Sequence, residues 1–252
     1  MQLPEFFADT SDVSEIEKLV KLNLISGITT NPVIVAKDSN GSDPYLGYKR
    51  LVARFPEYPV SIQLLDEPAE KLLEHAKEFS KISSNIVIKI PMFGDGRAVE
   101  ILPALIRDGV NINVTGLMST EQVLAILKAG NGKGPVYVSL FFNRIRDGGS
   151  NPIEEITKTR ALINKFESRT RIITGSIRKP DDVFDAVIAG THIVTITPLV
   201  FWAMINHPKS VEFINQSQTA WEELLKLQKD VNGEIHVRKK THQVPRKHLA
   251  TR

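Results

Sequence analysis

The sequence predicts an α/β protein built as a closed (β/α)8 barrel with one additional C-terminal helix. Short runs rich in β-branched residues alternate with longer amphipathic segments, which is typical of parallel strands joined by helices. Eight such runs occur, and 252 residues is a usual length for a single-domain barrel of this kind. No GxGxxG or P-loop motif is present, which disfavours an open nucleotide-binding sheet.

The predicted elements follow one another in regular order. The strands are expected at residues 6–8, 25–29, 60–64, 86–90, 110–114, 136–140, 171–174 and 193–196. Helices are expected between them at residues 13–22, 69–81, 100–107, 121–129, 153–166 and 181–189, several of them after capping residues such as Asp12 or Asn151. A last helix over 210–228 follows the eighth unit, and the polar segment 37–48 predicts a long loop.

The charge of the chain is concentrated in a basic tail. There are 32 Lys and Arg residues against 29 Asp and Glu, but residues 229–252 hold seven basic and two acidic ones. The remaining 228 residues are nearly neutral, and the 42% hydrophobic content is enough for one sizeable core. We predict one barrel domain over 1–231 and a basic tail without fixed structure over 232–252. A nucleic-acid partner is not expected, and binding through the tail is kept only as a separate hypothesis.

Other features of the composition exclude whole classes of site. The sequence has no cysteine, so it offers no disulfide, thiolate metal ligand or cysteine nucleophile. Its first residues lack the basic and apolar parts of a signal peptide, and no window approaches about 18 uninterrupted apolar residues. We therefore expect a cytoplasmic location and no membrane contact.

Lys89 interrupts an otherwise apolar strand, Ile-Val-Ile-Lys-Ile-Pro over 86–91. Burying a charged lysine is costly, and a lowered pKa relieves the cost by leaving a neutral amine, the form that attacks carbonyl carbon. An imine-forming lysine is therefore the leading hypothesis. Two alternatives stay open: a lysine paired with a carboxylate, and one that reaches water from the strand end.

Polar residues stand at the ends of most predicted strands, where (β/α)8 barrels carry their chemistry. With Lys89 attacking a ketone, Asp9 could move protons while the carbinolamine forms and breaks down. Gln63 and Thr115 are suited to positioning a water molecule. A single polar residue at a strand end is more often a helix cap or a turn former, so only the whole set describes a site.

The remaining strand-end residues are suited to holding a phosphorylated keto sugar. Asn31 and Asn113 can hold substrate hydroxyls without adding charge. Arg144, Ser176 and Arg178 offer donors for a phosphate, near the loops where barrels usually bind one. Three further residues complete the candidate substrate site, namely Thr29, Ser139 and Phe141.

Several of these segments together resemble the small transaldolase and fructose-6-phosphate aldolase family. The match runs in order from residue 5 to about residue 228, and the pairing of TTNP with a later VIKIP is specific. The segments are Asp9-Thr10 with Glu15-Ile16, GITTNP at 27–32, VIKIP at 87–91, Asn113-Val114-Thr115, Asn143-Arg144-Ile145 and GSIR at 175–178.

The resemblance implies a class I aldolase barrel that uses neither a metal nor another cofactor. It implies Lys89 as the Schiff-base residue, Asp9 as the acid and base, and a phosphate site at Arg144, Ser176 and Arg178. The expected partners are a phosphorylated keto sugar and an aldehyde acceptor. The resemblance also implies a homo-oligomer, a pentamer or decamer, in which the last helix packs on a neighbour.

Two positions point to different branches of this family. Position 63 is a glutamate in transaldolases and a glutamine in fructose-6-phosphate aldolases, and this chain has Gln63. Position 141 is a phenylalanine in transaldolases and a tyrosine in the aldolases, and this chain has Phe141. We favour transaldolase-type transfer of a dihydroxyacetone unit, because Phe141 offers no phenol to assist release of the enamine. The alternatives are reversible aldolase cleavage and an inactive barrel that only binds sugar phosphates.

Overall fold

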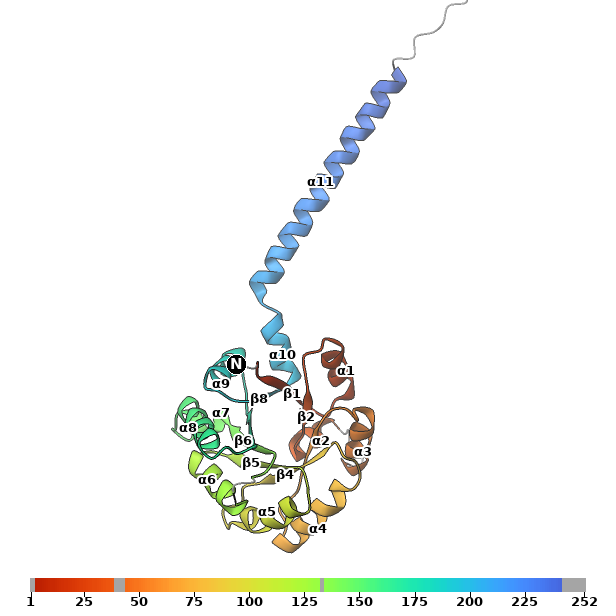
Figure 1. Cartoon of the computed structure of the whole chain (residues 1–252). Helices are drawn as coiled ribbons and strands as arrows, with labels where there is room; N and C mark the ends of the chain where they lie inside the picture. The colour runs from red at the N-terminus through yellow and green to blue at the C-terminus, as the bar shows by residue number, and fades with distance from the viewer. Residues whose placement is uncertain (1–2, 39–43, 132–133, 242–252) are drawn as a thin grey trace, which may run out of the picture. The chain divides into compact units, whose positions relative to one another are not determined.

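The computed structural model describes residues 3–38, 44–131 and 134–241 and contains a closed barrel of eight parallel strands (Figure 1). Each strand pairs with the next, and β8 pairs with β1 to close the ring. The strands are β1 (Glu5–Asp9), β2 (Gly27–Thr29), β3 (Val60–Gln63), β4 (Ile86–Pro91), β5 (Ile112–Leu117), β6 (Tyr137–Phe141), β7 (Arg171–Gly175) and β8 (Ile193–Ile196).

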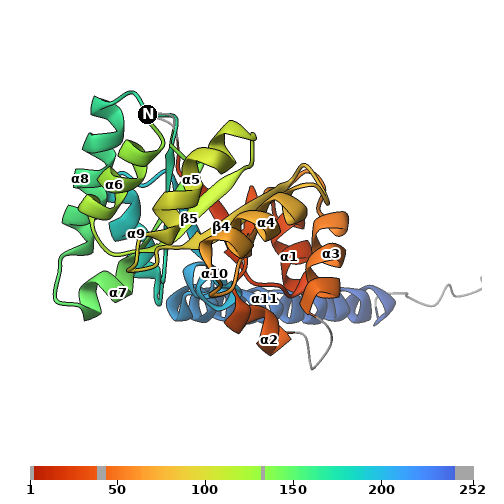
Figure 2. The same ribbon diagram turned by 90° about the horizontal axis from the view of Figure 1, so that it is seen from below.

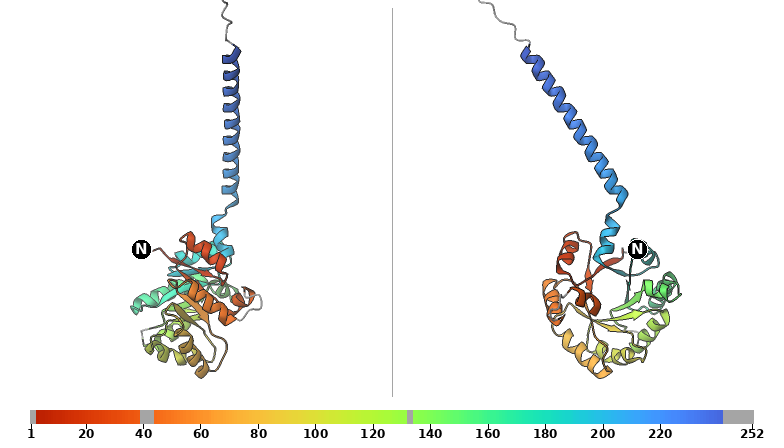
Figure 3. Two further views of the ribbon diagram at one scale, coloured as in Figure 1. Left: turned by 90° about the vertical axis from the view of Figure 1, so that its right-hand side faces the viewer. Right: turned by 180° about the vertical axis from the view of Figure 1, so that it is seen from behind.

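Helices follow the strands and surround the barrel, which Figure 3 also shows from behind. Those of the barrel region are α1 (Val13–Lys21), α2 (Pro32–Asp38), α3 (Pro44–Arg54), α4 (Ala69–Ser80), α5 (Arg97–Arg107), α6 (Thr120–Ala129), α7 (Phe142–Asp147), α8 (Pro152–Lys165), α9 (Pro180–Ile188) and α10 (Pro198–Ile205). Two short helices, α2 and α7, directly follow the carboxyl ends of their strands and lie toward the same edge of the barrel in Figure 2.

The predicted (β/α)8 fold is confirmed, with all eight strands and the six predicted helices in place. The predicted loop over 37–48 is wrong for the residues that the structure describes there. Lys37 lies in the last turn of α2, and residues 44–48 form the start of α3. Residues 39–43 lie outside the described part. Pro32 and Pro44 each open a helix, because proline at the first helical position loses no intrahelical hydrogen bond.

The chain divides into two compact units at residues 204 and 205. The first unit is the barrel. The second contains α11 (Pro208–Thr241), which is longer than the predicted helix over 210–228. The division into a domain over 1–231 and a tail over 232–252 stays a prediction, and residues 242–252 lie outside the described part. No helix in the described ranges is both long enough and apolar enough to cross a membrane.

The barrel interior has an apolar layer toward the amino ends of the strands and a polar layer toward their carboxyl ends. Five buried side chains, Phe7, Val87, Tyr137, Ile173 and Ile193, form one cluster inside the strands. Gly27 belongs to the same apolar layer, because a Cβ at this position would lie only 2.5 Å from the Phe7 ring. Side chains two residues apart on a strand face the same way, so the next layer toward the carboxyl ends holds Asp9, Thr29, Ser61, Lys89, Asn113, Ser139 and Thr195.

Candidate active site

Lys89 lies at the carboxyl end of β4, and only 4% of it is exposed. Its Nζ donates a hydrogen bond to the backbone carbonyl oxygen of Thr30 at 3.0 Å. Burial lowers the pKa of Lys89, and the charge of Asp9 opposes this only in part. In the described residues Lys89 forms no salt bridge, and its burial rules out a side chain that reaches water. The amine is therefore more easily deprotonated than that of an exposed lysine.

Asp9 ends β1 and is half-buried beside Lys89. Burial raises the pKa of Asp9, while the positive charge of Lys89 and a hydrogen bond from Thr29 act in the opposite direction. Thr29 Oγ1 donates that bond at 2.8 Å and lies 2.5 Å from Thr195 Oγ1 on β8. The Asp9 carboxyl is thus harder to deprotonate than an exposed aspartate, and the Lys89 amine is easier to deprotonate than an exposed lysine.

Thr195 was not found from the sequence. Its position inside the apolar strand Ile193–Ile196 gives no signal, and its contact with Thr29 joins residues 166 positions apart. Only closure of the barrel through the pairing of β8 with β1 brings the two hydroxyls together.

Asn113 is fully buried on β5 next to Lys89, its register partner on β4. Its Oδ1 accepts a hydrogen bond from Ser139 Oγ at 2.8 Å, and its Nδ2 donates to Ser61 Oγ at 3.4 Å. The amide is therefore fixed by hydroxyls from β6 and β3. Of these contacts, the sequence predicted the residues Asn113 and Ser139 but missed Ser61.

Gln63, Thr115 and Phe141 lie at the strand ends around Lys89. Gln63 is the register partner of Lys89 on β3 and is half-buried. Thr115 is buried near a β-bulge, and its hydroxyl has no hydrogen-bond partner among the described residues. Phe141 ends β6 opposite Gly175, where an added Cβ would lie 3.8 Å from the Phe141 ring. The carboxyl ends of β3, β5 and β6 thus carry an amide, a hydroxyl without a partner among the described residues, and an aromatic ring.

The side chain of Asn31 caps a helix, which is a common role for a polar residue at the end of a strand. Its Oδ1 accepts a hydrogen bond from the backbone N–H of Ile34 at 3.0 Å, as an N-cap residue does at the start of a helix. The helix it caps is α2, which begins at Pro32. The side-chain amide nitrogen of Asn31 takes no part in this contact.

The predicted phosphate-binding residues come from two neighbouring segments. Arg144 is exposed on α7, while Ser176 and Arg178 follow β7. Ser176 has a left-handed backbone with φ +59°, and its carbonyl oxygen accepts hydrogen bonds from Asn143 N and Nδ2 at 3.3 and 2.8 Å. The guanidinium of Arg178 forms a two-point pair with the carboxylate of Asp147. These contacts hold α7 against the loop after β7.

Asp182 is the fully buried centre of this junction, and the sequence analysis missed it. Its carboxylate accepts hydrogen bonds from Asn143 Nδ2 at 2.7 Å, Arg146 Nη1 at 3.0 Å, and the backbone N–H groups of Arg178 and Lys179 at 3.0 and 3.2 Å. Burial alone would raise the pKa of Asp182, but these donors outweigh it and lower the pKa. A buried ionised carboxylate therefore fixes the backbone that carries Arg178.

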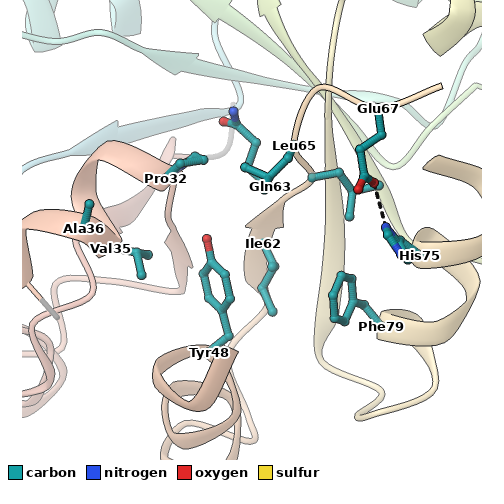
Figure 4. A pocket seen from close by; sticks show the side chains of 11 residues that line it. Pro32, Val35, Ala36, Tyr48, Ile62, Gln63, Leu65, Glu67, His75 and Phe79 are labelled. Carbon is teal, nitrogen blue, oxygen red and sulfur yellow. Dashed lines mark hydrogen bonds and ion pairs between the residues drawn. The ribbon is translucent and has the colours of Figure 1, made fainter. Parts of the chain in front are cut away.

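A separate cavity of about 130 Å³ lies beside β3 (Figure 4). Apolar side chains such as Val35, Ile62 and Phe79 line most of it, and Glu67 pairs with His75 at 2.7 Å on its other side. Gln63 also lines this cavity, whereas Lys89 does not. Within the described ranges, no cluster of three or more His, Asp or Glu residues could hold a metal ion.

Comparison with known proteins places these features in a family. The model of the transaldolase/fructose-6-phosphate aldolase family matches residues 6–243. A probable transaldolase of Thermoanaerobacter sp. (strain X514) is 34% identical over 218 residues, which cover 86% of this chain and 96% of that protein. A probable transaldolase of Lactiplantibacillus plantarum is 31% identical over 226 residues, covering 89% of this chain and all of that protein.

A likeness in fold extends to a solved structure described as a cube-shaped, highly porous protein cage designed by fusing symmetric oligomeric domains. Its TM-score is 0.54 at 10% identity, and the overlay covers 98% of this chain and 88% of that chain. This likeness concerns the fold alone. The family match spans the whole barrel and the strand-end residues described above. The chain belongs to the transaldolase/fructose-6-phosphate aldolase family.

Proposed function

We propose that this protein is a class I transaldolase that transfers a dihydroxyacetone unit between sugar phosphates through a Schiff base on Lys89. The observation that carries the proposal is the buried amine of Lys89, whose pKa is lowered, beside Asp9, whose pKa is raised. A neutral amine and a protonated carboxyl are the forms needed to add to a ketone and to expel water from the adduct.

The first half of the proposed reaction cleaves the donor sugar. Lys89 Nζ attacks the C2 carbonyl of the ketose phosphate, and the carbinolamine loses water to give an iminium ion as Asp9 supplies the proton. The ionised Asp9 then takes the proton of the C4 hydroxyl. The C3–C4 bond breaks, its electron pair moves toward the iminium nitrogen, and an aldehyde phosphate leaves an enamine on Lys89.

The second half passes the three-carbon unit to an acceptor. The enamine carbon C3 attacks the carbonyl carbon of an aldehyde phosphate, and the carbonyl oxygen takes a proton from Asp9. Hydrolysis of the new iminium frees the amine of Lys89 and a new ketose phosphate. Gln63 and Thr115 are proposed to position the water of these steps, because Gln63 is the register partner of Lys89 and the Thr115 hydroxyl is unpaired within the described residues.

The remaining predicted residues are assigned to binding the substrate. Four residues face or adjoin the polar layer around Lys89, and we propose that they hold the hydroxyl groups of the substrate. They are Thr29, Asn31, Asn113 and Ser139. Arg144, Ser176 and Arg178 are proposed to bind the phosphate. The last group lies where two βα loops meet at the carboxyl ends of β6 and β7, the end of a barrel at which sites form.

Gln63 supports one alternative function, aldolase-type release of free dihydroxyacetone. A neutral amide cannot act as a general base in the transfer steps, whereas Phe141 cannot donate a proton to the enamine. We place transfer first because release needs that proton and transfer does not. Replacing Gln63 by Glu should raise the rate of transfer, and an unchanged rate would require another proton shuttle.

The test follows glyceraldehyde 3-phosphate released from fructose 6-phosphate with and without erythrose 4-phosphate. Transaldolase activity predicts release that depends on the acceptor. Continuous release without the acceptor would establish the aldolase alternative, and absence of release under both conditions would leave a barrel that only binds sugar phosphates. Lys89→Met is the control and should abolish carbon–carbon cleavage in every case.

We also propose that the protein is a homo-oligomer. In the second unit, α11 presents Val211, Ile214, Trp221 and Leu225 on one face, and all four are exposed. A stripe of this kind is typical of helices that pack against another chain. Light scattering on the full chain should give a mass several times 28.1 kDa, and Trp221→Glu should lower it.

A further inference from the structure

Asp147 stands between the two arginines of the proposed phosphate site. It lies three residues after Arg144 on α7, a spacing that puts both side chains on one face of the helix. Its Oδ1 accepts from Arg178 Nη1 at 3.0 Å, and its Oδ2 accepts from Arg178 Nη2. The Arg178 hydrogen bond and the charges of Arg178, Arg144 and Arg146 lower the pKa of Asp147 and outweigh the opposing effect of burial. Asp147 is therefore an ionised carboxylate held by one arginine and close to another.

The other charges nearby are already compensated. Arg146 pairs with the buried Asp182, and Lys179 pairs with Asp181 at 3.1 Å. The charge available to a ligand therefore depends on Arg144, Arg178 and Asp147. With Asp147 ionised, the three groups carry one net positive charge instead of two.

We propose that Asp147 sets the anion affinity of this site by competing with the substrate phosphate for the Nη donors of Arg178. The inference rests on the proposed role of Arg178 in binding phosphate. A planar guanidinium binds carboxylate and phosphate through the same pair of N–H groups, so a ligand must displace the Asp147 carboxylate from them.

The competition acts on every anion that needs Arg178. Each of them must displace the Asp147 carboxylate, so the pair lowers the apparent affinity of all of them by the same factor. The displaced carboxylate also repels the bound anion, and this repulsion is larger for a phosphate monoester, which carries a charge of about −1.5 to −2 at neutral pH, than for a singly charged carboxylate. Asp147 thus weakens the binding of every anion and weakens that of phosphate most.

The test measures dissociation constants of inorganic phosphate and of acetate by calorimetry for the full-length protein and four variants. Asp147→Asn should bind phosphate about twofold to fivefold more tightly, the range expected for loss of one exposed ion pair. Its affinity for acetate should rise by a smaller factor, because the displaced carboxylate repels the singly charged acetate less than it repels phosphate. Asp147→Glu keeps the charge and should retain the wild-type preference.

Asp181→Asn is the matched control, because it removes an exposed carboxylate near the same loop without contacting Arg178. An equal gain in Asp181→Asn would overturn the proposal in favour of a general field effect. Weaker phosphate binding by Asp147→Asn would also overturn it, since Asp147 would then position Arg178. If Arg178→Ala binds phosphate as well as the wild type does, the proposed phosphate role of Arg178 fails, and the competition fails with it.

Discussion

Lys89 shows how the burial of a single residue can lower stability while making its amine easier to deprotonate. Its amine is buried and donates one hydrogen bond, to the carbonyl oxygen of Thr30. Burial destabilises the charged form, and the resulting fall in pKa increases the fraction of the nucleophilic neutral amine. The conflict between stability and function is therefore expected to be largest at this position.

Lys89→Met should increase the free energy of unfolding at neutral pH by about 1 kcal/mol or more, because it removes a buried group that is costly to charge. Since the pKa of Lys89 is lowered in the folded protein, wild-type stability should rise as the pH approaches 10.5, where the unfolded lysine loses its proton. The variant should lack this rise. Urea denaturation near neutral pH and near the lysine pKa measures both effects, and a less stable variant would contradict them.

Thr115 offers a second test at the residue scale. Its buried hydroxyl is unpaired within the described residues, so Thr115→Val should raise the free energy of unfolding by about 1 kcal/mol while turnover falls. Thr174→Val is the matched control, because the equally buried Thr174 hydroxyl donates to Thr191 Oγ1 at 2.8 Å. The control should be less stable than the wild type. Equal changes in urea denaturation for the two variants would show that the Thr115 hydroxyl is not a stability cost.

The sequence identified residues by local pattern and missed those defined only by distant contacts. Lys89 stands out because a charge interrupts an apolar run. Asp182 does not stand out, because an acid in the first turn of a helix after Pro180 is ordinary. Its partner Asn143 is 39 positions away, and no local signal records that contact.

At the scale of elements, the short helix α7 depends on its contacts with the loop after β7. It has only six residues, too few to be stable alone, and its attachment runs mainly through Asn143 and Asp182. The order of the proposed phosphate site therefore depends on one buried carboxylate.

Asp182→Ala should lower the free energy of unfolding by about 3 kcal/mol, because it leaves several buried donors without an acceptor. It should also weaken binding of inorganic phosphate as the loop that carries Arg178 loses its anchor. Asp181→Ala is the control and should change stability by less than about 0.5 kcal/mol, since Asp181 is exposed. Similar losses in both variants, measured by urea denaturation, would contradict a special role for Asp182.

Elements with strong periodicity could be predicted from the sequence, and short ones could not. All eight strands were found, because apolar β-branched runs alternate with amphipathic helices. The end of α2 and the start of α3 fall in the segment 37–48, which the sequence predicts as a loop because it is rich in Ser, Asn, Gly and Asp. Pro32 and Pro44 were the available signals, because proline is favoured at the first helical position.

At the scale of the whole molecule, the pairing of β7 with β8 brings together a second titratable contact, which does not involve Lys89. His192 precedes β8, and its Nδ1 accepts a hydrogen bond from the backbone N–H of Ile172 on β7 at 3.0 Å. Burial, together with the charges of Arg160 and Arg171, lowers the pKa of His192 from 6.5 to about 4. The neutral ring thus takes part in a hydrogen bond between β7 and the residue before β8.

Because the pKa of His192 is lower in the folded protein, its contribution to stability is present above pH 6.5 and is lost as the pH falls toward about 4. The loss should be about 1 to 2 kcal/mol, since the ring is only partly buried. His192→Asn keeps an acceptor and should flatten this part of the pH profile. His207→Asn, at an exposed position, is the control, and a profile unchanged by His192→Asn would contradict the assignment.

The central claim is that Lys89 forms the covalent intermediate. The most direct test is borohydride reduction of the protein in the presence of fructose 6-phosphate, followed by intact mass and peptide mapping. We predict a three-carbon adduct on the peptide that contains Lys89 and none in Lys89→Met. An adduct on another lysine, or none with any ketose phosphate, would contradict the claim.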